Sequence, residues 1–140
     1  MADIVDKATR SRMMSGIRGK DTKPEMMVRK GLHALGLRYI LNVGKLPGKP
    51  DLVFPKHQTA LFVHGCFWHW HDCPAFRMPS SNQSFWREKI GSNRLRDQKN
   101  ISALKSLGWK TLVVWECEIK KAVVSGKFDN WAKKLAKRII

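Results

Sequence analysis

Residues 50–73 read PDLVFPKHQTALFVHGCFWHWHDC, and this stretch decides how the chain folds. Residues 52–54 and 59–64 are two apolar runs separated by a proline-led turn, a pattern that predicts a hairpin of buried strands. In an antiparallel pair the start of one strand lies beside the end of the other. We therefore expect Asp51 and His64 at the same edge of a sheet.

Further elements are expected on both sides of this hairpin. Asp21 or Thr22 can cap a helix start, Pro24 suits its first turn, and Gly36 can end it. Apolar spacing predicts the remaining elements. They are a strand over 38–43, a helix over 84–107 with Ile90, Ile101, Leu104 and Leu107 buried, a strand over 109–115 and an amphipathic basic helix over 128–140.

The order of these elements is helix, three strands, helix, strand, helix. Such an order predicts a mixed α/β domain in which a central sheet is flanked by helices. At 140 residues, 43% of them hydrophobic, the chain is long enough to form a single hydrophobic core.

The charge balance points to a polyanionic partner. Lysine and arginine total 27 against 11 acidic residues, which gives a formal net charge of +16. On a folded domain this excess favours nucleic acid as the partner over a basic protein that is merely soluble. The sequence shows no apolar run long enough to cross a bilayer and no signal pattern, so we expect a cytoplasmic protein with no membrane partner.

The cysteines suggest a metal site rather than disulfides. Cys66, His71 and Cys73 lie within eight residues, and Cys117 directly follows a predicted core strand. Three cysteines cannot all pair, whereas thiolates and imidazole suit a closed tetrahedral zinc site. We expect structural zinc to join the 66–73 loop to the end of the 109–115 strand; the alternative is a set of unrelated buried thiols.

Asp51 is a candidate ligand for a harder metal. A carboxylate at the start of a buried strand can bind magnesium, and the backbone carbonyl of Val63 is a second expected ligand. His64 and His69 are candidates for proton transfer, because the ordinary pKa of histidine lies near neutrality. The alternative is that Asp51 only caps a turn, and Glu25 is most simply a carboxylate at a helix start.

Aromatic residues surround this region in loops, where they cannot all belong to a core. They are Phe67, Trp68, Trp70, Phe85 and Trp86. Such side chains can stack on bases or insert into a base step; the alternative is that they support the cysteine-containing loop.

The N-terminal segment offers a second apolar edge. Met14 and Ile17 lie on adjacent faces of a short helix expected to end near Arg18. They either pack on the body of the protein or are carried to nucleic acid by the neighbouring arginines.

Several motifs in this order resemble the very-short-patch-repair endonucleases, the Vsr-type DNA mismatch endonucleases of bacteria. The resemblance covers the chain from about residue 6 to beyond residue 117. Its motifs are DKATRS at 6–11, LPGKPD at 46–51, HGCFWH at 64–69, FWREKIG at 85–91, GW at 108–109 and VWEC at 114–117.

The resemblance implies a restriction-endonuclease-like α/β core in which Phe62-x-His64 replaces the usual Glu-x-Lys. It implies an enzyme that nicks DNA 5′ of the mispaired T in a T:G mismatch, left when 5-methylcytosine deaminates, and so initiates very short patch repair. A monomer in the bacterial cytoplasm, associated with the nucleoid, is implied. The implied partners are double-stranded DNA carrying the mismatch, mismatch-repair proteins and a DNA polymerase.

The resemblance also implies roles for individual residues. Asp51 is the magnesium ligand, His64 and His69 are active-site histidines, Asp97 supports His69 as the base for the attacking water, and Glu25 contributes from outside the metal's direct ligands. The implied zinc ligands are Cys66, His71, Cys73 and Cys117. The implied DNA contacts are Phe67, Trp68 and Trp86 as a wedge from the major groove, and Met14 and Ile17 from the minor groove.

Two departures from the family pattern are visible: Val63 stands where threonine is familiar, and Trp70 replaces a histidine. We expect a single endonuclease domain, with a DNA-contacting arm or helix over 1–20 and a catalytic core over 21–140. Two other functions stay open at this point: a restriction endonuclease that cuts both strands, and a zinc-stabilised DNA-binding module without catalysis.

Overall fold

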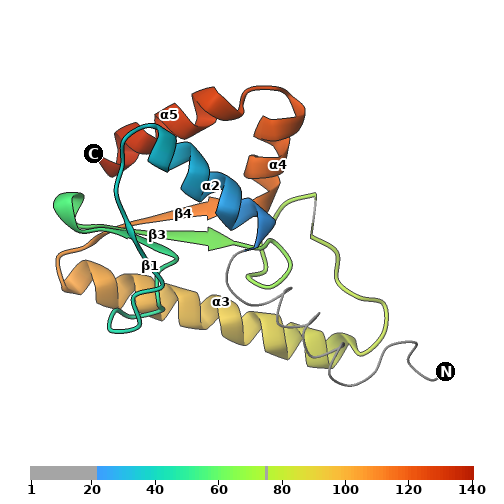
Figure 1. Ribbon diagram of the computed structural model, residues 1–140. Coiled ribbons are helices and arrows are strands. Elements are labelled where there is room, and N and C mark those ends of the chain that lie inside the picture. Colours follow the sequence, from blue (N-terminus) through green and yellow to red (C-terminus); the bar gives the residue numbers. More distant parts are fainter. Residues whose placement is uncertain (1–21, 75) are drawn as a thin grey trace, which may run out of the picture.

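The computed structural model describes residues 22–74 and 76–140 (Figure 1). The expected arm over 1–20, with Met14 and Ile17, lies outside the described residues. Among the helices that are described, none has the length and apolar character needed to span a membrane.

Four strands form one mixed sheet in the order β1-β2-β3-β4. The strands are β1 (Ile40–Leu41), β2 (Leu52–Phe54), β3 (Thr59–His64) and β4 (Lys110–Trp115). The β1–β2 and β2–β3 pairs are antiparallel, and β3–β4 is parallel. The predicted hairpin of 52–54 and 59–64 is confirmed; its turn contains the 3-10 helix η1 (Pro55–His57).

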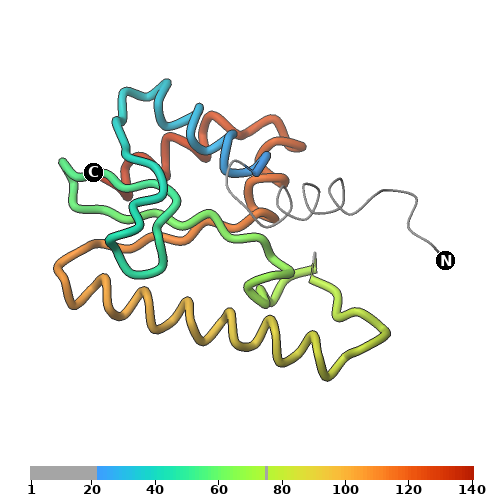
Figure 2. Tube along the Cα trace, turned by 60° about the horizontal axis from the view of Figure 1, so that its bottom comes forward, coloured from blue at the N-terminus to red at the C-terminus, as the bar shows by residue number. Residues whose placement is uncertain are grey.

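The helices cover both faces of the sheet, so the predicted mixed α/β architecture is confirmed. Helix α3 (Gln83–Ser106) runs along one face and connects β3 to β4. The other face is covered by α2 (Lys23–Ala34), α4 (Glu116–Val124) and α5 (Phe128–Ile139). A second view shows the same separation of α3 from the other helices (Figure 2).

The pleat of β3 divides the core between these two layers. Ala60 and Phe62 are buried with Leu104 of α3. Leu61, between them in sequence, belongs to the larger core on the opposite face. This alternation follows from the two-residue period of a strand. The larger core consists of Val28, Leu32, Leu37, Leu52, Phe54, Leu61, Val114, Ile119, Leu135, Ala136 and Ile139.

The start of α2 places a carboxylate near the sheet edge. The Thr22 hydroxyl accepts a hydrogen bond from Glu25 N–H at 3.4 Å, as an N-cap does. Pro24 occupies the first turn, and Gly36 beyond the helix end has a φ of +89°, which glycine adopts without strain. Glu25 is thereby fixed in the first turn, where it is buried.

The structure corrects three predictions about elements. The strand predicted over 38–43 is only Ile40–Leu41, and α4, absent from the predicted order, begins immediately after β4. Leu107 is 63% exposed rather than buried, because α3 ends at Ser106 and the chain turns there.

One buried hydroxyl joins β3 to the end of α5. Thr59 has no exposed surface, and its hydroxyl oxygen lies 3.1 Å from the carbonyl oxygen of Ile139 and 3.1 Å from that of His57. Thr59→Val preserves the shape and removes the donor. We expect the variant to lose about 1–2 kcal/mol of unfolding free energy, because the single hydroxyl proton that these two carbonyl oxygens share is lost from a buried position.

Urea unfolding measures this loss. Thr59→Ser is the matched control, because it keeps the hydroxyl and loses only a methyl group. The variants should rank wild type, serine, valine in decreasing stability, and a valine variant as stable as wild type would show that the hydroxyl contributes nothing.

Candidate active site and metal centre

The parallel pairing of β3 with β4 brings two chain segments to one sheet edge. His64 and Trp115, the last residues of the two strands, are direct partners in the register. The loop that carries Cys66, His71 and Cys73 leaves from His64, and α4 with Cys117 leaves from Trp115. The predicted site residues of the described part of the chain gather at or near this edge.

A cleft of about 670 Å³ opens beside this edge. It lies between the start of α2, the segment just before β2, the end of β3 and the middle of α3. Its acidic and histidine residues are Glu25, Asp51, His64, His69, Asp97 and Glu116. Its basic residues are Lys23, Lys49, Lys89 and Arg96.

Asp51 lies against the end of β3, as the hairpin predicts. Its Oδ2 accepts a hydrogen bond from Val63 N–H at 2.7 Å. Burial raises the pKa of Asp51 from 3.8 to about 7; the Val63 N–H opposes this shift, and the nearby Glu25 carboxylate adds to it. Two carboxylates held together with little water favour either a shared proton or a bound cation.

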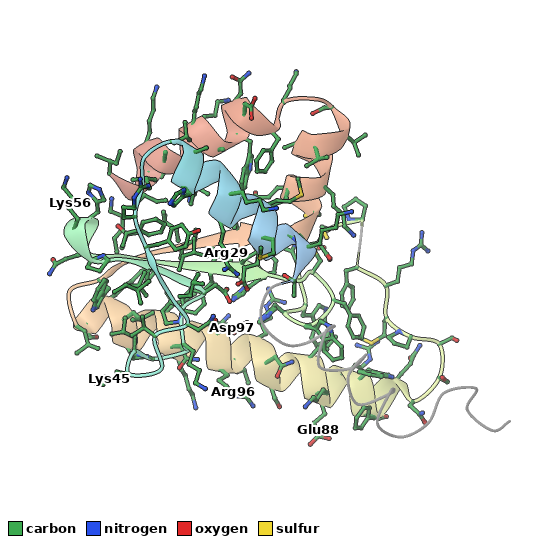
Figure 3. The ribbon with its side chains drawn as sticks, in the orientation of Figure 1. Arg29, Lys45, Lys56, Glu88, Arg96 and Asp97 are labelled. Atoms are coloured by element: carbon green, nitrogen blue, oxygen red, sulfur yellow. The ribbon has the colours of Figure 1, made fainter. Side chains whose placement is uncertain are left out.

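Glu25 also contacts a cation on its own helix. Arg29 Nη1 lies 3.4 Å from Glu25 Oε2, one helical turn away. Arg29 on α2 and Asp97 on α3 approach the sheet edge from its two faces (Figure 3). Arg29 thus balances part of the negative charge that Glu25 and Asp51 concentrate here.

His69 and Asp97 form a hydrogen-bonded pair. His69 Nδ1 lies 2.5 Å from Asp97 Oδ2. A carboxylate only accepts hydrogen bonds, so the Nδ1 atom carries the proton and donates. Nε2 of the neutral ring is then left with the lone pair, which is the arrangement of a general base oriented by a carboxylate.

His64 stacks directly on His69. The ring centroids are 3.7 Å apart and the planes differ by 4°. Burial lowers the pKa of His64 from 6.5 to about 3, so the ring is neutral at physiological pH. The argument from the ordinary histidine pKa therefore fails for His64, because that value applies to a solvated ring.

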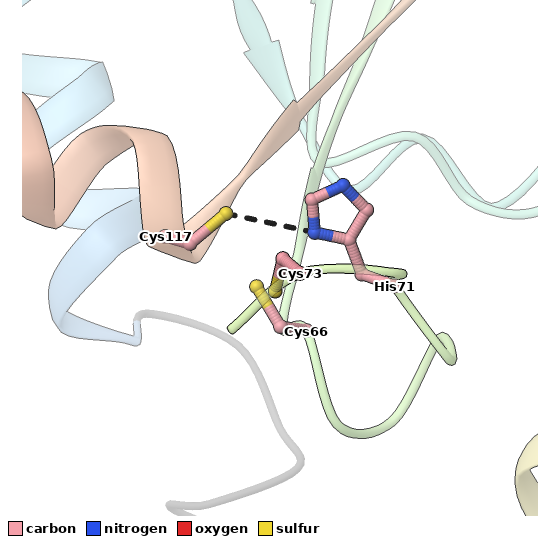
Figure 4. Close-up of side chains that lie close together, drawn as sticks. All are labelled: Cys66, His71, Cys73 and Cys117. Carbon is pink, nitrogen blue, oxygen red and sulfur yellow. Dashed lines mark hydrogen bonds between the residues drawn. The ribbon is translucent and has the colours of Figure 1, made fainter. Parts of the chain in front are cut away.

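Cys66, His71, Cys73 and Cys117 form a compact cluster (Figure 4). One ligand atom from each lies within 4.8 Å of all the others. His71 Nδ1 is 3.5 Å from Cys117 Sγ. Zinc bonds of about 2.3 Å to sulfur and 2.0 Å to nitrogen, at the tetrahedral angle, also separate two such ligands by about 3.5 Å.

Without a bound cation, the thiols of Cys66 and Cys117 resist deprotonation. Burial raises the pKa of Cys66 to about 12 and also raises the pKa of Cys117. A bound metal ion reverses this preference, since a coordinating thiol is deprotonated. Three sulfurs and one imidazole nitrogen are a donor set that can hold a metal ion.

Phe67, Trp68 and Trp86 contact one another beside the cleft. Their ring centroids are 5.1 Å apart for Phe67–Trp68, 5.4 Å for Phe67–Trp86 and 6.0 Å for Trp68–Trp86. All three are partly exposed, and Phe67 and Trp68 line the cleft. Asn93 of α3 donates a hydrogen bond to Trp68 O at 3.1 Å, which ties the loop to the helix.

Sequence reasoning did not single out Arg29, Asn93 or Trp115 for this site. Arg29 follows Glu25 by one helical turn, so the spacing was a usable signal. Asn93 is four residues from both Lys89 and Asp97 on α3 and lines the same cleft. The contacts of Trp115 depend on the parallel register, which no local pattern of residues indicates.

Comparison with known proteins places the chain in a family. Residues 2–75 match the family model described as DNA mismatch endonuclease Vsr. The chain is 47% identical over 124 residues to the Type II nicking enzyme V.NmeAIP of Neisseria meningitidis serogroup A, covering 89% of each chain. It is 45% identical over 120 residues to the DNA mismatch endonuclease Vsr of Escherichia coli K12, covering 86% of this chain and 77% of that one.

A third relative is the Type II nicking enzyme V.XorIIP of Xanthomonas oryzae, with 45% identity over 119 residues, 85% of this chain and 88% of the relative. These three matches cover 85% to 89% of the chain, so they extend well beyond residues 2–75. The chain is therefore a DNA endonuclease that belongs to the Vsr family of DNA mismatch endonucleases.

Proposed function

We propose that this protein is a magnesium-dependent endonuclease that nicks DNA 5′ of the mispaired T in a T:G mismatch left by deamination of 5-methylcytosine. The nick initiates very short patch repair. The observation that carries the proposal is one cleft in which Asp51 and the His69–Asp97 pair adjoin four basic side chains and an aromatic cluster.

Asp51 and the backbone carbonyl of Val63 are the proposed magnesium ligands, with Glu25 contributing from outside the direct ligands. The fit of this site to a cation rests on the buried pair of carboxylates, whose charge is costly without one. When bound, magnesium supplies charge stabilisation at the phosphate and lowers the pKa of a coordinated water.

His69 is the proposed base. Its Nε2 takes a proton from the attacking water while Nδ1 donates to Asp97, which stabilises the imidazolium that forms. A bond forms between the water oxygen and phosphorus, and the bond from phosphorus to the leaving sugar oxygen breaks; solvent protonates that oxygen. Neutral His64 fixes the plane of His69 through the stacked rings.

The aromatic cluster provides a route to mismatch selectivity. Phe67, Trp68 and Trp86 are proposed to insert from the major groove, with Met14 and Ile17 of the arm approaching from the minor groove. A T:G pair stacks less well than a Watson–Crick pair, so opening the adjacent step costs less. Phosphate contacts from Lys23, Lys49, Lys89 and Arg96 add affinity with little selectivity.

Nicking is favoured over cleavage of both strands. Relatives from Neisseria and Xanthomonas bear the name nicking enzyme, and the relative from Escherichia coli bears the name mismatch endonuclease. We therefore propose a monomer acting on double-stranded DNA, with mismatch-repair proteins and a DNA polymerase acting on the same lesion. The DNA-binding module without catalysis is not supported, because the family is one of endonucleases.

Zinc is the metal proposed for the cysteine cluster. Cys66, His71, Cys73 and Cys117 supply four ligands, which close a tetrahedral site and leave no position for a reacting water. The proposed role is structural: zinc joins the 66–73 loop to α4, and through the loop it supports His69 and the aromatic cluster.

The function is tested with end-labelled duplexes that differ at one pair, T:G, T:A or C:G, in a flanking sequence varied across the series. We expect magnesium-dependent nicking 5′ of the T in the T:G duplex alone, and no nicking with EDTA. Equal cutting of the matched duplexes, or cleavage of both strands by a dimer, would support the restriction endonuclease instead.

Asp51→Asn is the diagnostic variant for this assay. Asparagine keeps an oxygen that can accept from Val63 N–H and loses the charge that a cation needs. We expect nicking to fall by at least about a hundredfold with DNA affinity retained. Asp72→Asn is the matched control at an exposed carboxylate nearby, and it should nick at the wild-type rate.

Removal of the proposed zinc should loosen the fold. Purified protein should contain one zinc per chain, and Cys73→Ser should bind it weakly and lose about 10 °C or more in Tm, because structural zinc contributes folding free energy. Metal analysis and thermal unfolding provide the two readouts. Asp72→Asn again serves as the control. Unchanged zinc content and Tm in Cys73→Ser would show that Cys73 is not a zinc ligand.

A further inference from the structure

His64 lacks the usual means by which an active-site histidine is oriented. The ring of a catalytic or metal-binding histidine is normally oriented by a hydrogen bond to its second nitrogen. Asp97 provides this bond for His69. For His64, the Nδ1 atom is buried and has no hydrogen-bond partner among the described residues. Its orientation therefore depends on the rings packed around it.

Within residues 22–74 and 76–140, three rings contact His64. His69 stacks on it at 3.7 Å, Phe62 lies at 5.6 Å with an interplanar angle of 52°, and Trp115 lies at 5.2 Å with an angle of 72°. Phe62 belongs to the same strand, and His69 is itself the group that must be positioned. Trp115 is the ring that reaches His64 from the neighbouring strand, where the two residues are register partners.

The same indole is held by the cysteine cluster. His71 stacks on Trp115 with ring centroids 3.8 Å apart and planes 6° apart. Nδ1 of His71 faces Cys117 Sγ, and Cys117 follows Trp115 by two residues. Ordering the cluster therefore fixes a ring against one side of Trp115 and fixes the chain just beyond it.

We propose that Trp115 is a positioning residue that transmits the order of the cysteine cluster to the active site. The contacts run from His71 to Trp115, then to His64, and then to the stacked His69. Zinc binding thereby sets the plane of the proposed base without touching the substrate. This inference rests on the proposed zinc site and on the proposed role of His69.

The first test replaces the indole. We expect Trp115→Leu to reduce the single-turnover nicking rate at saturating DNA by about 10- to 100-fold, the usual effect of removing an orienting partner. Zinc content and DNA Kd should stay at wild-type values. Trp115→Phe, which keeps an aromatic ring, should recover most of the rate, and equal rates for the leucine variant and wild type would overturn the proposal.

The second test changes the zinc ligand that carries the stack. His71→Cys supplies a fourth thiolate, so zinc is retained while the ring on Trp115 is lost. We expect this variant to lose rate as Trp115→Leu does, and the double variant to lose little more, because both changes break one chain of contacts. Wild-type nicking by a zinc-loaded His71→Cys protein would contradict the proposal.

A spectroscopic readout separates this proposal from the proposed function. In zinc-loaded protein without DNA or magnesium, the imidazole ¹H–¹⁵N signals of His64 and His69 should shift in Trp115→Leu and in His71→Cys. Unchanged signals in Trp115→Leu would overturn the positioning role even if nicking is confirmed. Zinc content measured on wild type shows separately whether the cluster holds the metal, and if His71→Cys loses zinc, Trp115→Leu alone decides.

Discussion

The parallel pairing of β3 with β4 is the constraint on which the rest of the structure depends. Six register pairs, from Thr59↔Lys110 to His64↔Trp115, bring two strand ends together that are far apart in sequence. From this edge one strand continues into the loop with Cys66 and the other into α4 with Cys117. The long helix α3 makes the parallel connection possible and also delivers Asp97 to the cleft.

Burial gives the two strand-edge groups opposite pKa shifts with the same result. The pKa of Asp51 is raised to about 7 and the pKa of His64 is lowered to about 3, so the metal-free fold favours the neutral form of both side chains. The free energy of unfolding therefore falls as pH rises from 3.8 towards 7, because Asp51 ionises more readily in the unfolded chain. It also falls as pH drops from 6.5 towards 3, because His64 is protonated more readily in the unfolded chain. In the proposed function a cation beside Asp51 offsets this cost, while neutral His64 remains an uncharged stacking partner for His69.

Sequence patterns predicted the parts of the fold that have local signals. The hairpin, which brings Asp51 to the end of β3, followed from two apolar runs and a turn, and α2 followed from its cap and Pro24. Helix α4 was missed because no glycine, proline or usual N-cap residue marks its start after β4; its N-cap is Trp115, whose N–H donates to the Glu118 carboxylate. The stacks of His64 on His69 and of His71 on Trp115 depend on the path of the loop after β3 and on the parallel register. Neither feature produces a periodic pattern of residues in the sequence, so the contact between the two proposed sites could only be found in the structure.

The central claim is that one sheet edge carries two chemically different metal sites side by side. Its most direct test is anomalous diffraction from crystals of the protein with T:G duplex and manganese, which shares magnesium's preference for oxygen ligands. The account predicts a zinc peak among Cys66, His71, Cys73 and Cys117, and a separate manganese peak beside Asp51 and the Val63 carbonyl. A cysteine cluster without zinc, or manganese bound away from Asp51, would contradict it.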